Sequence, residues 1–267
     1  IVPPLASLEG GLRGEAFSEH SRTSPGDRLF VHLAQQERGR PISRQGAEQR
    51  PYAPPMTMPF SAAQTRQQAA ALGFTEAGII PAAPSPRLDA YLRWIEAGMH
   101  GTMGYLARPD RLARRRDLNV ILPGARALVV VALTYATDAV PPSMLGDPRR
   151  GRISTYAWGA DYHAIMTPRL EALAAWLRDQ SGQEVASRVY VDTGAILERD
   201  HAQGAGLGFT GKNTLLIHPR RGSYLFLGEV LTTLPFDAYD APGRETLCGT
   251  CARCLAACPT GAFPRPY

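Results

Sequence analysis

The chain has 267 residues, of which 44% are hydrophobic and 20% are charged, and its formal net charge is +5 at pH 7. This composition excludes a wholly disordered chain and a collagen-like repeat, and the longest apolar runs are far shorter than a bilayer span. No stretch of the sequence has the pattern of a secretory signal peptide, so we expect a cytoplasmic protein with no membrane partner. The modest basic excess suits an anionic partner.

Residues 1–57 differ in composition from the rest of the chain. They are rich in Pro and Gly, hold only three aromatic residues and carry nearly balanced charges. Such a segment cannot bury enough apolar surface to offset the ordering of its backbone. We therefore expect residues 1–57 to be disordered, or to be translated upstream sequence, and the folded part to begin near residue 58.

Helices and strands alternate from residue 61 onward, which predicts the fold class α/β, with an α/β domain over residues 58–238. The continuous apolar, β-branched run 127–135 is typical of a strand buried on both faces. In chain order, the apolar spacing predicts a helix over 61–72, a strand over 74–80, a helix over 86–97, a strand over 127–135, a helix over 163–180, and strands over 188–191, 215–217 and 224–231.

Polar residues beside two of these strands are candidates for a functional site. A run of three arginines, Arg114, Arg115 and Arg116, precedes the buried strand. The run forms either a solvated patch or a contact to a phosphate or amide group. Asp192 ends the strand 188–191, and ligands of open α/β sheets bind at the carboxyl ends of strands. Its alternative role is to cap a helix over 194–204. The following pair, Glu198 and Arg199, is more typical of a structural ion pair than of a catalytic one.

The segment 204–214 is rich in glycine and contains Lys212, the only lysine beside 28 arginines. A P-loop requires Ser or Thr directly after its lysine, whereas Asn213 stands there. The spacing G-x-G-x-x-G occurs from Gly206 to Gly211, but it does not directly follow a strand. We interpret the segment as a loop that brings backbone close to a large planar or phosphate-bearing ligand.

The four cysteines of the chain, Cys248, Cys251, Cys254 and Cys258, have the spacing C-x2-C-x2-C-x3-C-P. Such clustering favours a metal site over a disulfide scaffold, and this spacing is that of bacterial ferredoxins, in which the fourth cysteine ligates the other cluster of a pair. Zinc sites usually have two separated cysteine pairs or accompanying histidines. We therefore expect residues 239–267 to be the truncated start of a ferredoxin-like [4Fe–4S] module, without a second cysteine run.

Taken in order, these stretches resemble the epoxyqueuosine reductase family. The resemblance extends from about residue 71 to residue 266. It is carried by residues 156–163 (YAWGADYH), 191–199 (VDTGAILER), 204–215 (GAGLGFTGKNTL), 226–229 (FLGE) and the cysteine run that begins CGTC at residue 248. Several blocks in the right order are more specific than any one motif.

The resemblance implies a cobalamin in the α/β domain, reduced through two [4Fe–4S] clusters by an unidentified electron donor, and a monomer that acts on tRNA carrying epoxyqueuosine. Reduced cobalt would attack the cyclopentane ring of epoxyqueuosine, and Asp192 would give a proton to the departing oxygen, which yields queuosine. That role needs a protonated carboxyl. The residues that match the family's cobalamin pocket are Arg115, Tyr156, Asp192, Lys212 and Thr214, and those that match its cluster ligands are Cys248, Cys251, Cys254 and Cys258.

This chain differs from the family's pattern at two places, and two other functions are compatible with the same motifs. Thr155 stands where the family has Arg, so one contact to cobalamin or tRNA is expected to be lost. The chain shows one cysteine run where the family has two. A corrinoid reductive dehalogenase has a similar domain plan, and a ferredoxin-type electron carrier would use the α/β part only to dock a partner.

Overall fold

The fold is that of a computed structural model, and the structure describes residues 58–136, 140–145 and 147–263. All of these belong to one compact unit, Pro54–Tyr267. The predictions made for residues 1–57 lie outside the described residues. Among the described residues, no helix is long and apolar enough to cross a membrane.

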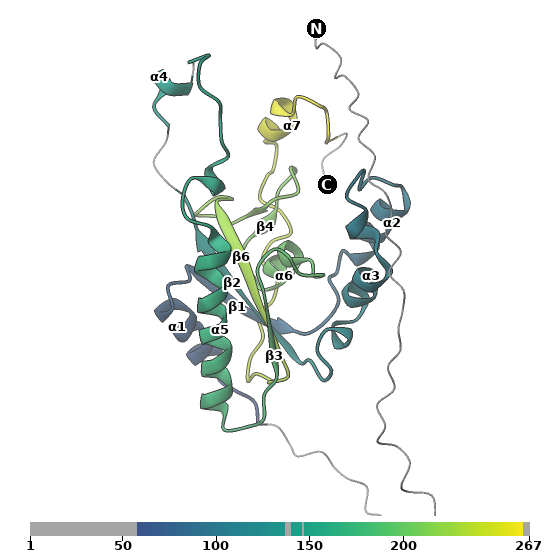
Figure 1. The fold of residues 1–267 in the computed structure, drawn as a ribbon, viewed down its shortest axis with the longest axis vertical. Helices are drawn as coiled ribbons and strands as arrows, with labels where there is room; N and C mark the ends of the chain where they lie inside the picture. Colours follow the sequence, from purple (N-terminus) through teal and green to yellow (C-terminus); the bar gives the residue numbers. More distant parts are fainter. Residues whose placement is uncertain (1–57, 137–139, 146, 264–267) are drawn as a thin grey trace, which may run out of the picture. The chain divides into compact units, whose positions relative to one another are not determined.

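A four-stranded sheet forms the centre of the fold (Figure 1). Its strands lie in the spatial order β1 (Glu76–Pro81), β2 (Ala127–Thr134), β6 (Leu225–Thr232) and β3 (Ser187–Tyr190). Every neighbouring pair is antiparallel. The predicted mixture of helices and strands is therefore confirmed. Asp192 follows the carboxyl end of β3, but the rule for parallel sheets does not apply to it, because the order of helices and strands along a chain does not fix strand direction.

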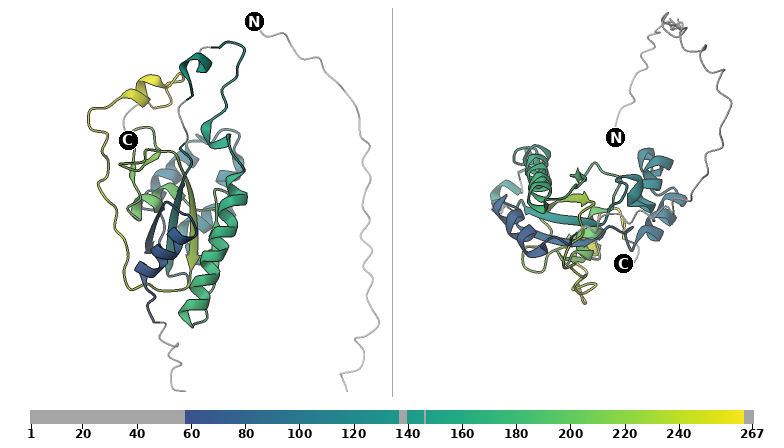
Figure 2. Two further views of the ribbon diagram at one scale, coloured as in Figure 1. Left: turned by 90° about the vertical axis from the view of Figure 1, so that its left-hand side faces the viewer. Right: turned by 90° about the horizontal axis from the view of Figure 1, so that it is seen from below.

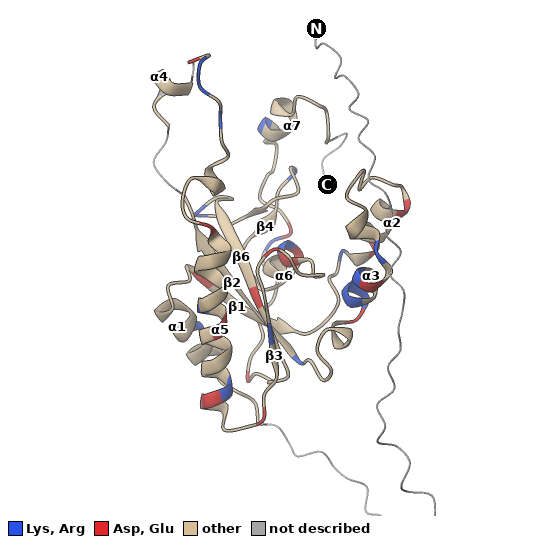
Figure 3. Cartoon of the chain, viewed as in Figure 1, with Lys and Arg blue, Asp and Glu red and all other residues tan. Residues whose placement is uncertain are grey.

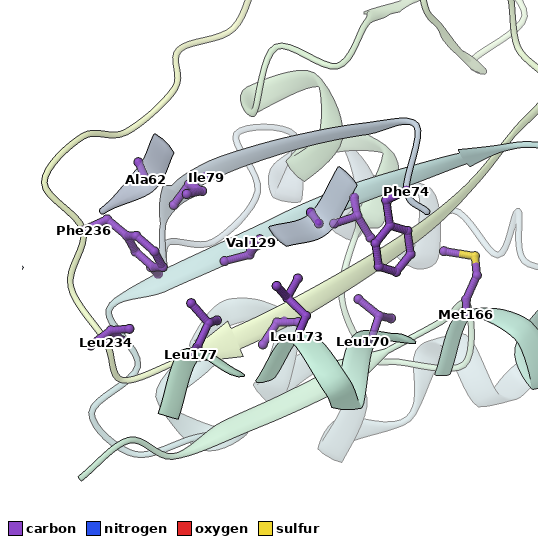
Figure 4. Close-up of a cluster of buried hydrophobic side chains, with 14 of the residues drawn as sticks. Ala62, Phe74, Ile79, Val129, Met166, Leu170, Leu173, Leu177, Leu234 and Phe236 are labelled. Atoms are coloured by element: carbon purple, nitrogen blue, oxygen red, sulfur yellow. The ribbon is translucent and has the colours of Figure 1, made fainter. Parts of the chain in front are cut away.

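Strand β2 is buried on both faces, as predicted, with residues 127–132 fully buried. Alternate side chains of a strand point to opposite faces, so Val129 and Val131 join one hydrophobic cluster and Leu128 and Val130 join the other. The first cluster packs β2 against the helix α5 (Tyr162–Ser181), whose Leu170, Leu173 and Leu177 project toward the sheet in Figure 4. The second lies between the sheet and the helix α6 (Glu198–Gly204).

The longer helices lie close to their predicted positions. Helix α1 (Ala62–Ala71) begins after Ser61, whose side chain accepts a hydrogen bond from the backbone of Gln64. Helix α5 ends at Gly182, which has a left-handed conformation. Figure 2 shows α1 and α5 on the same side of the sheet. The remaining elements are α2 (Leu88–Glu96), η1 (Gly104–Ala107), α3 (Pro109–Arg116), η2 (Leu118–Val120), α4 (Pro142–Leu145), η3 (Thr155–Ala157), β4 (Phe209–Thr210), β5 (Leu216–Ile217) and α7 (Arg253–Ala257).

Gly78 of β1 lets the end of α6 approach the sheet closely. A Cβ atom at this position would lie 2.5 Å from the carbonyl oxygen of Ala205 and 2.9 Å from its Cβ. We expect Gly78→Ala to destabilise the protein by about 1–3 kcal/mol, because the end of α6 would have to move away from the sheet. Urea denaturation measures this. Gly151→Ala is the matched control, since a Cβ there meets no atom within 4 Å, and equal midpoints for the two variants would contradict the expectation.

Candidate functional site

Asp192 lies two residues after the end of β3 and has a left-handed backbone, with φ +61°. This conformation is uncommon for residues other than glycine, and such strained positions concentrate at functional sites. The hydroxyl of Tyr162 donates a hydrogen bond of 2.9 Å to Oδ2 of Asp192. The alternative role of Asp192 as a helix cap was wrong, because α6 begins at Glu198 and its N-cap residue is Leu197. Asp192 is instead an exposed carboxylate held in place by a tyrosine.

A stack of aromatic rings fixes the position of Tyr162. Its ring lies 4.3 Å from that of Phe226 at an interplanar angle of 7°, and Phe226 stacks in turn on Tyr135 at 4.3 Å. Burial, and then the hydrogen bond to Asp192, raise the pKa of Tyr162. The hydroxyl therefore stays protonated and available as a donor to Asp192.

Behind Asp192 lies the carboxyl group of Glu198, the first residue of α6. Burial, followed by the charges of Glu229 and Asp192, raises the pKa of Glu198 to about 8. The backbone of Asp192 acts in the opposite direction and lowers this pKa. Oε1 of Glu198 is buried and has no hydrogen-bond partner among the described residues. The expected pairing of Glu198 with Arg199 is not what the structure shows, since Arg199 is exposed and donates to the carbonyl of Thr214 at 2.9 Å.

A fully buried pair joins α6 to the sheet beneath the site. Nδ1 of His201 lies 3.0 Å and 3.1 Å from the two carboxyl oxygens of Glu229 on β6, and the side chains are 3% and 0% exposed. Burial lowers the pKa of His201, but the carboxylate of Glu229 outweighs it, so the net shift is upward. This pair was not predicted from the sequence, although a glutamate inside the apolar strand LFLGEVLT indicates a buried charge that needs a partner.

Only the middle residue of the arginine run on α3 turns inward. Arg114 and Arg116 are exposed, whereas Arg115 is 6% exposed, and its guanidinium carbon lies 4.7 Å from the ring centroid of Tyr91. Figure 3 shows the concentration of basic residues on this short helix. Nε and Nη1 of Arg115 are buried without a hydrogen-bond partner among the described residues. Arg115 is thus a buried cation with two donors to offer.

Lys212 holds the cysteine segment against the glycine-rich segment. Its ammonium donates to the carbonyl oxygens of Gly249 at 2.7 Å and of Cys251 at 3.0 Å. Gly208 is required by the tight pairing of β4 with β5, because a Cβ there would lie 2.7 Å from the carbonyl oxygen of Ile217. The glycine spacing therefore serves a hairpin, and it is not the fingerprint of a dinucleotide-binding loop.

The other two residues predicted to bind cobalamin lie at exposed or strained backbone positions. Thr214 has a left-handed backbone, with φ +63°. Tyr156 lies in η3 and is 52% exposed. A largely apolar pocket of about 760 Å³ adjoins η3, and Thr155 and Trp158 are among its lining residues.

The four cysteines lie before, within and directly after the short helix α7. The backbone N–H of Cys251 donates to the carbonyl of Cys248 at 2.9 Å, and that of Ala262 donates to Sγ of Cys258 at 3.3 Å. No two of these described cysteines form a disulfide. In the part of the chain that the structure describes, no three His, Cys, Asp or Glu side chains are gathered closely enough to hold a metal ion. The donor set suits an iron–sulfur cluster by its chemistry and spacing, and ligation stays a prediction.

Comparison with known proteins gives consistent matches. Residues 115–193 match the family described as "Epoxyqueuosine reductase QueG, DUF1730". A relative named epoxyqueuosine reductase from Synechocystis sp. is 43% identical over 193 residues, which cover 71% of this chain and 63% of the relative. One of the same name from Gloeobacter violaceus is 42% identical over 211 residues, which cover 77% of this chain and 62% of the relative.

Solved structures agree with these relatives. A crystal structure of an epoxyqueuosine reductase is 32% identical, with a TM-score of 0.66, and the match covers 76% of this chain and 53% of that one. Another, solved with an epoxyqueuosine-modified tRNA stem loop, has a TM-score of 0.65 at 32% identity, over 76% and 53% of the two chains. This chain thus spans between about half and just under two thirds of the length of the proteins that it matches. Over that shared region, the chain is related in sequence and in fold to the epoxyqueuosine reductases, as its motifs predicted.

Proposed function

We propose that this protein reduces epoxyqueuosine to queuosine in tRNA, with a bound cobalamin and with electrons that an external donor supplies through [4Fe–4S] clusters. The arrangement at Asp192 carries the proposal: a strained, exposed carboxyl group held by Tyr162 lies at the end of the region that matches the family. A related protein was solved with an epoxyqueuosine-modified tRNA stem loop, which supports modified tRNA as the substrate here. The positive net charge suits tRNA phosphates.

Asp192 is proposed as the acid that protonates the departing epoxide oxygen. The residue is exposed and therefore open to a substrate, while the hydroxyl of Tyr162 holds Oδ2 of its carboxyl group. A positioned acid of this kind contributes about 10²- to 10⁴-fold to a rate. In support, a solved relative from Bacillus subtilis is described with a catalytic aspartate loop swung out of its active site.

Arg115 is the residue of this chain that best fits a cobalamin. Its two buried, unpartnered N–H groups are donors for the amide oxygens that surround a corrin ring. We assign Tyr156, Thr214 and Asp192 to the same pocket, and Lys212 to its border with the cysteine segment, because its ammonium binds that segment's carbonyls. When bound, cobalamin would supply the reduced cobalt that attacks the epoxide-bearing ring.

Cys248, Cys251, Cys254 and Cys258 are proposed as cluster ligands. The hydrogen bond from Ala262 to Sγ of Cys258 is of the kind that stabilises a thiolate, and the hydrogen bond with Thr260 lowers the pKa of that thiol. The two bonds of Lys212 fix the backbone between the first two cysteines. These contacts place the cysteine segment beside the glycine-rich segment, as electron delivery to the same domain requires.

The test is conversion of tRNA that carries epoxyqueuosine. The whole open reading frame that contains this sequence is expressed, reconstituted with iron, sulfide and cobalamin, and supplied with a strong chemical reductant. Queuosine in the digested tRNA, measured by mass spectrometry, is the expected result. Turnover of a halogenated phenol with none of modified tRNA would replace the proposal with a reductive dehalogenase, and failure to retain cobalamin would favour an electron carrier.

A further inference from the structure

The turn that carries Lys212 joins β4 to β5, and its backbone is held at several points. The N–H of Gly211 donates to the carbonyl of Leu215 at 2.9 Å, and the N–H of Thr214 donates back to the carbonyl of Gly211 at 2.9 Å. The side chain of Arg199 then donates to the carbonyl of Thr214, also at 2.9 Å. Lys212 therefore projects from a turn whose backbone is fixed on both sides.

The ammonium of Lys212 lies between two carbonyl oxygens of the cysteine segment, residues 248–258. Nζ is 2.7 Å from the oxygen of Gly249 and 3.0 Å from that of Cys251. Gly249 has a left-handed backbone, with φ +49°, and the N–H of Cys251 closes the turn on the carbonyl of Cys248 at 2.9 Å. The negative ends of two peptide dipoles thus converge on one place, and an ammonium, which has three donors, satisfies both.

The type of residue at this place and the charges near it point to a role for the positive charge. The chain has 28 arginines and no lysine other than Lys212. A compact ammonium can direct its donors at two separate carbonyls, whereas the planar fork of arginine suits a carboxylate or a phosphate. The cysteine segment itself contains one charged residue, Arg253, which is exposed. Lys212 adds a second positive charge, bound directly to the backbone of the segment.

We propose that Lys212 is a positioning residue for electron delivery: it docks the cysteine segment on the β4–β5 hairpin and makes a cluster bound there easier to reduce. Reduction transfers one electron from the external donor and makes the cluster more negative by one charge. A cation bound to the loop of its ligands therefore stabilises the reduced form. The charge effect rests on the proposed function, which supplies the cluster, whereas the docking does not.

The docking is measured on the protein without a cluster. The whole open reading frame that contains this sequence is purified with a chelator under reducing conditions and digested briefly with an arginine-specific protease. Lys212→Met is expected to raise the rate of cleavage after Arg253 about tenfold, the size of one net hydrogen bond, because cleavage follows the population of the opened segment. Cleavage after Arg149, whose side chain is 89% exposed, is the control within the same digest and should not change.

The charge effect is measured on the reconstituted protein, by a redox titration followed by electron paramagnetic resonance. In Lys212→Met we expect the equilibrium constant for one-electron reduction of one cluster to fall about tenfold, which lowers its midpoint potential by about 59 mV. Lys212→Arg keeps a positive charge and several donors and should stay close to the wild type. Arg178→Met removes a positive charge from an exposed position of α5 and should leave the potential unchanged.

The outcomes separate this inference from the proposed function. A wild-type rate of cleavage after Arg253 in Lys212→Met would overturn the docking. An unchanged potential in that variant, or an equal shift in Lys212→Arg, would overturn the charge effect. A reconstituted wild type that holds no cluster would overturn the [4Fe–4S] part of the proposed function together with the charge effect, while the digestion still decides the docking. Potentials that shift as expected, without conversion of modified tRNA, would overturn the proposed reaction alone.

Discussion

Replacement of Asp192 by Asn is expected to lower kcat for conversion of epoxyqueuosine by about 10²- to 10⁴-fold, the range that a positioned acid contributes. Asparagine has nearly the same shape, can accept the hydrogen bond from Tyr162 and tolerates a left-handed backbone. It cannot give a proton to the departing oxygen. Single-turnover assays with modified tRNA, read by mass spectrometry of the nucleosides, measure the loss.

The accompanying measurements separate chemistry from binding. Cobalamin binding, followed by its visible spectrum, should be unchanged in Asp192→Asn. Tyr162→Phe removes only the hydroxyl and leaves the ring stacked on Phe226, so a smaller loss of about tenfold is expected, the size of one hydrogen bond. Turnover at the wild-type rate by Asp192→Asn would show that another group, or water, supplies the proton.

Replacement of Glu229 by Ala is expected to reduce the free energy of unfolding by about 3–5 kcal/mol, because it leaves the buried imidazole of His201 without its partner. Since the folded-state pKa of His201 is raised, the pair stabilises the protein fully below the unfolded pKa of about 6.5, and this contribution disappears as the pH rises through the folded value. The loss in Glu229→Ala should therefore be larger at pH 6 than at pH 9. Urea denaturation at the two pH values measures it.

Two further variants test the cause of this destabilisation. Replacing both partners, as His201→Phe with Glu229→Leu, should recover much of the stability, because apolar side chains of similar size often replace a buried ion pair without loss. Glu171→Ala, at an exposed position of α5, should change the free energy of unfolding by less than about 0.5 kcal/mol. If Glu229→Ala unfolded at the wild-type urea concentration at both pH values, the pair would contribute nothing to stability.

Local patterns determined much of the fold from the sequence. The apolar run of β2 predicted burial on both faces, and the helical spacing in α5 predicted its core-facing leucines, because these periodicities depend only on the geometry of a strand or a helix. The motifs around Asp192 and Lys212 indicated the relationship to the epoxyqueuosine reductases for the same reason, since they are contiguous in the chain.

Contacts between residues far apart in sequence were decided only by the tertiary structure. Tyr162 and Asp192 are 30 residues apart, His201 and Glu229 are 28 apart, and Lys212 and Gly249 are 37 apart. No local pattern encodes such contacts, because they depend on which strands pair and in which direction. The sequence by itself therefore determined the longer helices and strands, the relationship to the epoxyqueuosine reductases and the choice of Asp192 as a candidate acid. Only the tertiary structure decided that the hydroxyl of Tyr162 holds Asp192, because α5 packs against the sheet and stacks the ring of Tyr162 on Phe226 of β6.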